Sequence, residues 1–388
     1  MTLSDRAQRQ GADEFAFELR YDLWRLPTFE PNFAYPVHRW FHFKEGFSRD
    51  LVELLAKRMG LREGDVVLDP FVGSGTTPLT CMELGLGAVG VDASPLMVLI
   101  SFAKTRMYDP ERLRAEAERL SSVRLRTHDL SGLSPLVRRA FRSETLHQLL
   151  SLREEVEGIG DRDVRAFFTL ALMSAAMRCS YAVKDGSVIR MERRPVPELP
   201  KAFRSKVRQM IDDVERIALK SGPAEIYLGD ARELAFLGDG SVDAVITSPP
   251  YLNKIEYTKV YEIEMELFLG GRKPDLVRSY IGLSPRPGRV PPEVEGLPDS
   301  AVAYFVDIEQ SLSEVLRVLR RGGRAAFVVS GGVYPGLVVE VDLVLARIAR
   351  RLGFEVERVI ALGKRVATYE RVKKIGETRE SAVLLRKA

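Results

Sequence analysis

Two short segments of this sequence combine residue types that could bind and act on a small polar ligand. Residues 69–77 read Asp-Pro-Phe-Val-Gly-Ser-Gly-Thr-Thr, an acid followed by a glycine turn. Glycine lets the backbone come close to a ligand, and the acid before it favours a ligand with a positive charge. Residues 247–251 read Thr-Ser-Pro-Pro-Tyr. Consecutive prolines make a stiff loop with few N–H donors, so its outward carbonyls suit a planar amine.

Two phosphate-binding interpretations of residues 69–77 fail on the sequence. A P-loop requires a lysine directly after its second glycine, and Thr76 follows Gly75. The pyrophosphate fingerprint requires a third glycine three residues further on, where Pro78 stands. The glycine turn therefore points to a ligand other than a phosphate group.

The elements around these segments predict a doubly wound α/β sheet. Short apolar runs that read as strands cover residues 65–69, 88–91, 224–228, 242–247, 324–329, 355–361 and 382–385. Helical spacing follows the first two runs, over 76–84 and 95–104. Both segments thus lie at carboxyl ends of strands, where open α/β sheets bind ligands. Asp92 ends the second strand, where an acid accepts hydrogen bonds from ribose hydroxyls.

The α/β alternation is interrupted once. Residues 108–221 read as helical and Arg-rich, and Asp109-Pro110 is a good helix start. We expect an N-terminal extension over 1–34, a first part of the α/β domain over 35–107, the helical insert over 108–221, and a second part over 222–388. Residues 300–321 read as an amphipathic helix, and the proline-rich stretch 270–299 reads as a long loop.

Residues 69–77 and 247–251 together resemble motifs I and IV of the S-adenosylmethionine-dependent amino-methyltransferases, which modify exocyclic amines of bases. Residues 90–96 are similar to motif II, residues 229–232 to motif III, and residues 38–44 to motif X. The resemblance implies a Rossmann-like, seven-stranded class I methyltransferase sheet with a helical insertion. Ser-Pro-Pro-Tyr is the spelling typical of cytosine-N4 enzymes, whereas Asp or Asn in place of Ser marks adenine-N6, guanine-N2 or glutamine-N5 enzymes.

The resemblance implies S-adenosylmethionine as cofactor and assigns roles to individual residues. The catalytic loop would be Ser248, Pro249, Pro250 and Tyr251, with Ser248 and a proline carbonyl accepting from the amine and Tyr251 stacking on a base that has left its helix. The predicted cofactor residues are Phe41, His42, Asp69, Phe71, Gly73, Ser74, Gly75, Thr76, Thr77, Asp92, Ala93, Asp230 and Ala231.

The substrate is predicted to be a nucleic acid. Basic residues outnumber acidic ones in 184–208 and in 364–374, as in phosphate-binding faces, although a solvated helix face reads the same way. The predicted substrate contacts are Asn253, Tyr257, Lys259, Arg193, Arg194 and Arg204.

Two departures from the family pattern leave the target open. The spelling of residues 69–77 resembles the class in which motif IV precedes motif I, yet motif I comes first here, and the insert lies between motifs II and III. The chain resembles stand-alone archaeal members, some of which act on ribosomal RNA, and no duplex-reading motif is apparent. RNA is therefore placed slightly ahead of DNA. A glutamine-N5 methyltransferase and an inactive cofactor-binding scaffold remain as alternatives.

Composition limits the other classes. Two cysteines and four histidines predict neither a disulfide framework nor a metal site. Residues 1–10 carry charges and no apolar core, so we expect no signal peptide there. No apolar run is long enough to span a bilayer. We expect a cytoplasmic protein without a membrane or metal partner, and the sequence leaves its oligomeric state open.

Overall fold

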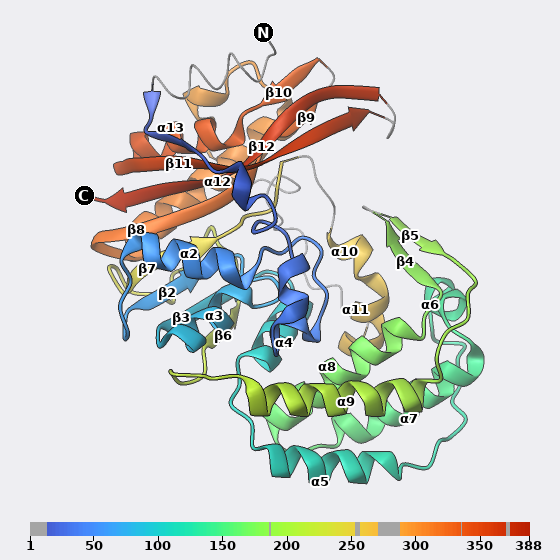
Figure 1. Ribbon diagram of the computed structural model, residues 1–388. Helices are drawn as coiled ribbons and strands as arrows, with labels where there is room; N and C mark the ends of the chain where they lie inside the picture. Colours follow the sequence, from blue (N-terminus) through green and yellow to red (C-terminus); the bar gives the residue numbers. More distant parts are fainter. Residues whose placement is uncertain (1–13, 186–187, 253–256, 271–287, 335, 370–372) are drawn as a thin grey trace.

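An eight-stranded mixed sheet organises the protein (Figure 1). The computed structural model describes residues 14–185, 188–252, 257–270, 288–334, 336–369 and 373–388. The strand order is β1-β11-β12-β8-β7-β2-β3-β6. The strands are β1 (Phe17–Leu19), β2 (Val66–Asp69), β3 (Gly87–Asp92), β6 (Glu225–Leu228), β7 (Val242–Thr247), β8 (Leu319–Ser330), β11 (Phe354–Tyr369) and β12 (Lys373–Lys387).

The seven predicted strands are all present, and β1 adds an eighth at the edge beside β11. Strands β6, β3, β2, β7 and β8 run parallel, and β12 lies antiparallel between β8 and β11. The direction of the strand order reverses at β2 and β7, so a switch point lies between their carboxyl ends. A ligand site is expected there in an open α/β sheet.

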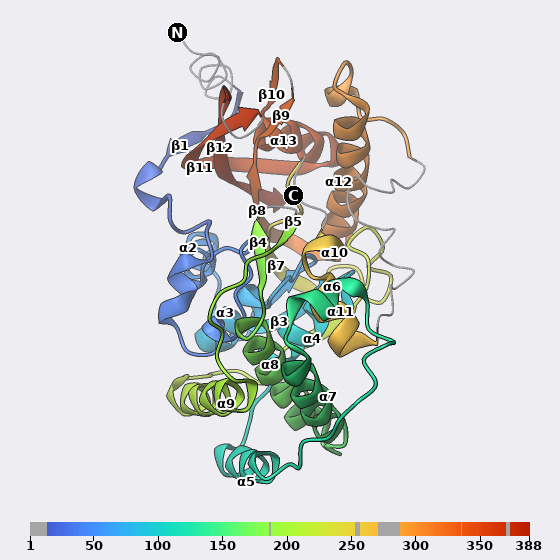
Figure 2. The ribbon, with the colours of Figure 1, turned by 90° about the vertical axis from the view of Figure 1, so that its right-hand side faces the viewer.

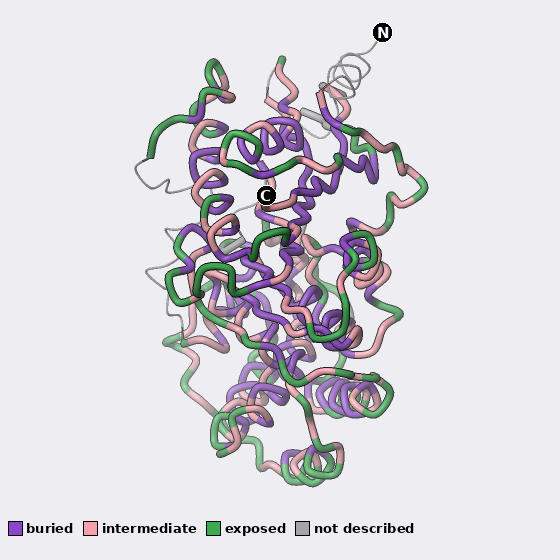
Figure 3. Tube along the Cα trace, turned by 90° about the vertical axis from the view of Figure 1, so that its left-hand side faces the viewer, coloured by how far each residue is buried: buried purple, intermediate pink, exposed green. Residues whose placement is uncertain are grey.

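Helices cover both faces of the sheet because its strands are apolar on both sides. On one face α2 (Arg49–Met59) and α3 (Thr76–Leu84) pack on residues such as Val67 and Ile246. On the other, α12 (Asp299–Val318) and α13 (Val341–Leu352) pack on residues such as Leu68 and Phe327. Figure 3 shows the buried residues running through the centre of the molecule. None of the helices in the described ranges is long and apolar enough to cross a bilayer.

The last two strands are much longer than predicted. They form a hairpin that pairs from Phe354 with Lys387 to Tyr369 with Lys373. Lys364, Arg365 and Val366 lie in the part of the hairpin that extends past the strand β8, and they are exposed. Strands are predicted from runs of apolar residues, and this part of the hairpin has no such run. The extension was therefore missed. A second, short hairpin of β9 (Gly332–Tyr334) and β10 (Leu337–Val339) follows β8.

The insert is not purely helical, which corrects the prediction for 108–221. A hairpin of β4 (Ala182–Asp185) and β5 (Val188–Met191) interrupts it. The hairpin lies beside α10 (Tyr257–Val260) in Figures 1 and 2. The insert helices are α5 (Pro110–Ser121), α6 (Pro135–Ala140), α7 (Ser143–Glu157), α8 (Arg162–Arg178) and α9 (Leu199–Arg216). The predicted cap forms, because the Asp109 side chain accepts a hydrogen bond from the N–H of Glu111 at 3.0 Å.

The insert shares one apolar core with the segment that follows motif IV. Its centre is formed by residues of α8 such as Phe167 and Phe168, which are fully buried. Helices α4 (Pro95–Lys104), α10 (Tyr257–Val260) and α11 (Glu262–Leu269) contribute to the same core. The insert therefore packs on the polypeptide that follows the catalytic loop in sequence, and not only on the strands that flank the insert.

Short 3₁₀ helices in the described ranges cover Tyr21–Leu23, Glu30–Ala34, His38–Trp40 and Pro292–Val294.

Candidate active site

Motifs I and IV meet at the switch point of the sheet. Strands β2 and β7 are parallel neighbours, so their carboxyl ends lie side by side. The Thr247 hydroxyl at the end of β7 donates a 2.6 Å hydrogen bond to Asp69 Oδ1 at the end of β2. Both side chains are buried, and the N–H of Phe71 donates to the same oxygen at 3.1 Å. Two segments that lie 170 residues apart in the sequence numbering thus form one site.

The glycine loop of motif I depends on glycine at two positions. Gly73 and Gly75 have φ angles of +50° and +81°, in the left-handed region that other residues avoid. A Cβ atom on Gly73 would lie 2.9 Å from Cε1 of Phe43, and one on Gly75 would lie 2.7 Å from Oγ of Ser101. The loop is therefore closely packed from both sides before α3 begins at Thr76.

Asp92 holds the glycine loop against the end of β3. Its Oδ2 accepts from the N–H of Gly73 at 2.9 Å, and its Oδ1 accepts from the N–H of Ser94 at 2.8 Å. Each carboxylate oxygen retains a second lone pair. Asp92 can therefore fix the loop and still accept hydrogen bonds from a ribose. Ala93 follows it and is partly exposed.

Burial shifts the acid–base behaviour of the two acids. It raises the pKa of Asp69 to about 6, and the negative charge of Asp92 adds to that rise, while the hydroxyl of Thr247 lowers it. Burial likewise raises the pKa of Asp92 to about 6 against the opposing N–H donors of Ser94 and Gly73. A cation bound beside these carboxylates would favour their charged forms.

A buried lysine that the sequence analysis did not select supports the same loop. Lys104, at the end of α4, is 1% exposed, and its ammonium group donates to the carbonyl of Ser74 at 2.8 Å. Burial lowers its pKa to about 7, and the charge of Lys206 contributes to the lowering. The position reads as the last residue of an apolar helix, so only the packing of α4 on motif I identifies it.

Buried hydroxyls at the carboxyl edge of the sheet fit a polar ligand. Within the described part of the chain, the side chains of Ser74 and Ser330 are buried without a hydrogen-bond partner. Ser74 lies in the glycine loop, and Ser330 ends β8, the neighbour of β7. Together with Asp69 and Asp92, these groups match the amino, hydroxyl and sulfonium groups of S-adenosylmethionine. Of the described residues, no three His, Cys, Asp or Glu side chains are placed to hold a metal ion.

The aromatic residues of motif X pack on other rings of the protein. Phe41 is buried with its ring 6.0 Å from the ring of Tyr261, and the ring of His42 lies 5.0 Å from that of Phe33. Phe43, the next residue, is the one that contacts the glycine loop at Gly73. The cofactor roles of Phe41 and His42 stay predictions. We add Phe43 to the predicted cofactor residues because it contacts the glycine loop.

Asp230 of motif III is held within the protein. Its carboxylate accepts from Nε and Nη2 of Arg232 at 3.0 and 2.8 Å. Arg232 is buried and also donates to Asp307 of α12 at 2.8 Å. Ala231 is buried between them. This ion-pair network fixes the turn after β6, and contact of Asp230 and Ala231 with the cofactor stays a prediction.

The catalytic loop (residues 248–251) is fixed through its side chains. Oγ of Ser248 donates to the carbonyl of Val328 on β8 at 2.9 Å. The Tyr251 hydroxyl donates to Oε1 of Glu380 on β12 at 2.8 Å. Burial raises the pKa of Tyr251 well above its usual range, and the charge of Glu380 adds to this rise, so the phenol stays protonated.

Glu380 lies between the catalytic loop and a surface arginine. Its side chain is 3% exposed and pairs with Nε and Nη2 of Arg365 at 2.9 and 3.0 Å. Arg365 belongs to the basic 364–374 segment, and its side chain is 44% exposed. Sequence reading could not find Glu380, because it stands 129 residues after Tyr251 and carries no motif.

The predicted substrate residues are spread over three places. Asn253 lies outside the described residues, Tyr257 begins α10, and Lys259 is exposed on that helix. Arg193 and Arg194 follow β5, and Arg204 is exposed on α9. Two other basic residues of 184–208 point inward: Lys206 is buried, and Lys184 pairs with the buried Glu264 of α11. The basic face is therefore smaller than the sequence indicates.

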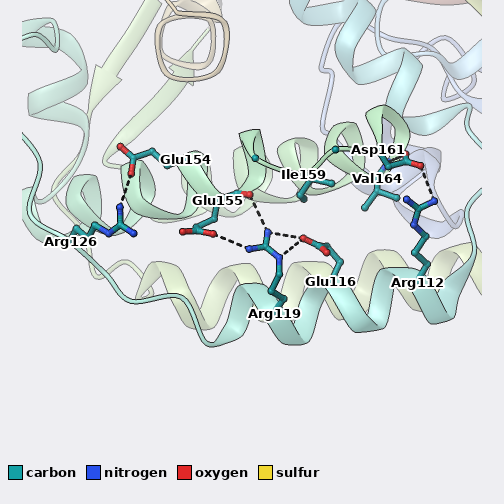
Figure 4. A pocket seen from close by; sticks show the side chains of 11 residues that line it. Arg112, Glu116, Arg119, Arg126, Glu154, Glu155, Ile159, Asp161 and Val164 are labelled. Atoms are coloured by element: carbon teal, nitrogen blue, oxygen red, sulfur yellow. Dashed lines mark hydrogen bonds and ion pairs between the residues drawn. The ribbon is translucent and has the colours of Figure 1, made fainter.

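A separate cavity of about 460 Å³ lies in the insert between α5, α7 and α8 (Figure 4). Its charged side chains pair with one another. Arg119 contacts Glu116 at 2.7 Å and Glu155 at 2.9 Å, and Arg112 contacts Asp161 at 2.8 Å. It contains none of the predicted site residues, and its charges are already neutralised.

Comparison with known proteins agrees with the motif arrangement. A family model described as DNA methylase matches residues 6–102, which include motifs X, I and II. Type II methyltransferase M.BsoBI of Geobacillus stearothermophilus is 26% identical, over 88% of this chain and 83% of that protein. Residues 6–102 thus match this family, and most of the chain is similar to a type II methyltransferase. The protein is an S-adenosylmethionine-dependent methyltransferase, and the site at β2, β3 and β7 fits that cofactor.

Two further proteins are similar to this methyltransferase over different lengths. Type II methyltransferase M.AvaI of Nostoc sp. is 25% identical, over 87% of this chain and 83% of that protein. Type II methyltransferase M.MjaII of Methanocaldococcus jannaschii is 36% identical, over 28% of this chain and 20% of that protein.

Replacing Asp92 with alanine should weaken cofactor binding by about 1–3 kcal/mol, because it removes an acceptor for the ribose and releases the N–H of Gly73. Calorimetric titration with S-adenosylmethionine measures the loss. Asp129→Ala, at an exposed position of the insert, is the matched control and should bind normally. Unchanged affinity in the Asp92 variant would refute the ribose assignment.

Cofactor affinity should also fall with pH below about 6. The pKa values of Asp69 and Asp92 lie near this pH, so acid removes the negative charges that attract a sulfonium. If one carboxyl must be ionised, the Kd rises about tenfold per pH unit below its pKa. S-adenosylhomocysteine has a neutral sulfur and should respond less. A flat profile for S-adenosylmethionine between pH 5 and 7 would contradict this electrostatic role.

Proposed function

We propose that this protein methylates the exocyclic N4 amine of cytosine in DNA. The observation that carries the proposal is the Ser248 hydroxyl, which gives its proton to the carbonyl of Val328. A hydroxyl that donates one hydrogen bond keeps lone pairs that can accept others, and Ser248 is also hydrogen-bonded to the side chain of Tyr251. The spelling Ser-Pro-Pro-Tyr at residues 248–251, which resembles that of cytosine-N4 enzymes, supports the choice of amine.

DNA replaces RNA as the proposed substrate. The sequence analysis placed RNA slightly ahead and kept DNA as the alternative. The relatives that align over most of this chain are type II methyltransferases, and the matching family model is described as DNA methylase. These similarities favour the alternative. A glutamine side chain as acceptor is disfavoured because the motif carries Ser248 in place of asparagine.

The residues of the site have two roles. Some accept hydrogen bonds from the target amine, and others hold the cofactor. The N4 lone pair of cytosine is conjugated with the ring, so hydrogen-bond acceptors on its two hydrogens favour the tetrahedral, nucleophilic nitrogen. We assign these acceptors to Ser248 Oγ and the carbonyl of Pro249. When bound, S-adenosylmethionine supplies an electrophilic methyl group. Asp69 and Asp92 favour the cationic donor, and its neutral product, which lacks that charge, is held less tightly.

The target base must leave the double helix to reach such a site, since stacked neighbours cover its amine. Tyr251, which is held by Glu380, provides a ring on which the extruded base can stack, a contact worth about 1–3 kcal/mol. Orientation then supplies much of the rate, because the amine and the methyl group are held in line.

Transfer of labelled methyl groups from S-adenosylmethionine to purified nucleic acids tests the proposal. We expect incorporation into mixed-sequence duplex DNA and none into ribosomal RNA from the same host. Incorporation into RNA alone would overturn the choice of DNA. Incorporation into neither, while the cofactor still binds, would favour the inactive scaffold.

A further inference from the structure

Tyr181 joins two segments of the insert that carry arginines. Its N–H donates to the carbonyl of Ala140 at the end of α6 at 2.8 Å, and its carbonyl accepts from the N–H of Glu192 after β5 at 2.8 Å. Its hydroxyl accepts from Nε of Arg142 at 3.0 Å. The ends of α6 and β5 are therefore held together at the base of the β4–β5 hairpin.

Six arginines lie within two residues of Ala140 or Glu192, and all are exposed. We call them the arginine patch: Arg138, Arg139, Arg142, Arg190, Arg193 and Arg194. Val137 and Ala140 face the core, so Arg138 and Arg139 lie on the outer side of α6. Within the described ranges, Arg138, Arg139, Arg193 and Arg194 form no ion pair. The acidic residues nearby in the sequence are Glu144 and Glu192, both exposed.

Arginines elsewhere on the surface are commonly matched with acids. Arg351 contacts Glu293 at 2.8 Å and Glu309 at 2.7 Å, and Arg317 contacts Asp239 at 2.7 Å. Four arginines of the patch, Arg138, Arg139, Arg193 and Arg194, depart from this pattern within the described part of the chain. Neighbouring positive charges repel one another, and an anionic partner removes that repulsion.

The patch lies on the side of the insert that adjoins the catalytic segment. Strand β5 packs against α10, which begins six residues after Tyr251 in the sequence numbering. The views in Figures 1 and 2 agree that the hairpin stands beside α10. Lys184 of β4 pairs with Glu264 of α11 and lies over the ring of Tyr261. The hairpin therefore packs directly on the helices that follow the catalytic loop, and a partner bound at the base of the hairpin would lie next to them.

We propose that the arginine patch binds the phosphate backbone of duplex DNA beside the target cytosine. This inference rests on the proposed function for its choice of DNA. Arginine has a planar fork of donors that fits phosphate oxygens, and it stays charged at any physiological pH. Six such side chains on two segments suit a polymer with regularly repeated phosphates, and three of them, Arg138, Arg139 and Arg142, were not singled out by sequence reading.

The salt dependence of duplex binding tests the proposal. We compare the wild-type protein with the triple variant Arg138→Gln, Arg139→Gln, Arg193→Gln, using fluorescence anisotropy on a short random-sequence duplex. Each lost phosphate contact reduces the slope of log K against log salt by about 0.9, so the slope should fall by about 2–3. The triple lysine variant keeps the charges and should keep the slope.

The matched control places three glutamines at Arg58, Arg358 and Arg386. These arginines are paired with Glu18 or Glu355. Arg358 lies on β11 and Arg386 on β12, at the end of the β11–β12 hairpin that is opposite its turn. This variant should keep the wild-type slope. An unchanged slope in the patch variant, or a loss that the control shares, would overturn the proposal.

Two further outcomes separate this inference from the proposed function. A slope that falls for a structured RNA but not for the duplex would overturn duplex binding at the patch. A slope that falls for the duplex, in a protein that methylates no DNA, would uphold the patch and refute the proposed function.

Discussion

The Ser248→Ala variant should lose about ten- to a hundredfold in kcat, with cofactor affinity near that of the wild type. The expected loss corresponds to one hydrogen bond that strengthens as the amine becomes tetrahedral, about 1–3 kcal/mol. An interaction made mainly in the transition state lowers kcat and kcat/KM together. Single-turnover methylation of a DNA substrate measures the step directly.

Ser248 also braces the loop through Val328, so a structural loss must be separated from a chemical one. The Ser313→Ala variant removes a serine hydroxyl that donates to the carbonyl of Glu309 on the exposed side of α12, and it should be fully active. Thermal unfolding and S-adenosylmethionine binding of Ser248→Ala should match this control. Full activity of Ser248→Ala would show that backbone acceptors alone serve the amine.

Tyr251 and Glu380 should form a second pair with large effects. Tyr251→Ala removes the ring and should weaken capture of the target nucleotide by about 1–3 kcal/mol. From the sequence, Tyr251→Phe would keep most activity, because the ring does the stacking. The structure shows the hydroxyl donating to the buried Glu380. Tyr251→Phe takes a donor from a buried carboxylate, so it should also lose activity, although less than Tyr251→Ala.

Glu380 variants test whether this contact positions the ring. In Glu380→Gln the amide oxygen can still accept from Tyr251 and should preserve KM for DNA, whereas Glu380→Ala should raise KM with a smaller effect on kcat. Cofactor affinity should stay unchanged in both, which a general disruption of β12 would not allow. Equal damage from Tyr251→Phe and Tyr251→Ala would show that the hydroxyl, and not stacking, carries the role of this residue.

The central part of the sheet could be predicted from the sequence because each of its seven predicted strands contains a short apolar run. Residues 242–247 and the helices 76–84 and 95–104 have the bounds predicted for them. Among the elements that were missed, the extensions of β11 and β12 and the strand β5 share a physical reason. In the described part of the β11 extension Lys364, Arg365 and Val366 are exposed, and no residue of β5 is buried. These segments form because their backbones pair with a neighbouring strand. That strand is distant in the sequence or carries no apolar run of its own.

The candidate site was predictable where contacts are local. Motif I and motif IV carry their chemistry in consecutive residues, and strand order brings Asp69 to Thr247. Lys104 and Glu380 could not be predicted, because each contacts the site from a part of the chain that is distant in sequence. Lys206 was predicted to belong to a basic face on the surface, but it lies on the side of α9 that is buried in the core.

The identity of the methylated atom tests the central claim most directly. DNA from a methylase-free host that expresses this protein is digested to nucleosides, and these are separated and weighed by mass spectrometry. Chromatography is required because N4-methyl- and C5-methyl-deoxycytidine have the same mass. We predict N4-methyldeoxycytidine, which is absent when the host expresses Ser248→Ala. Methyl groups on N6 of deoxyadenosine, on C5 of deoxycytidine, or only on RNA nucleosides would contradict the account.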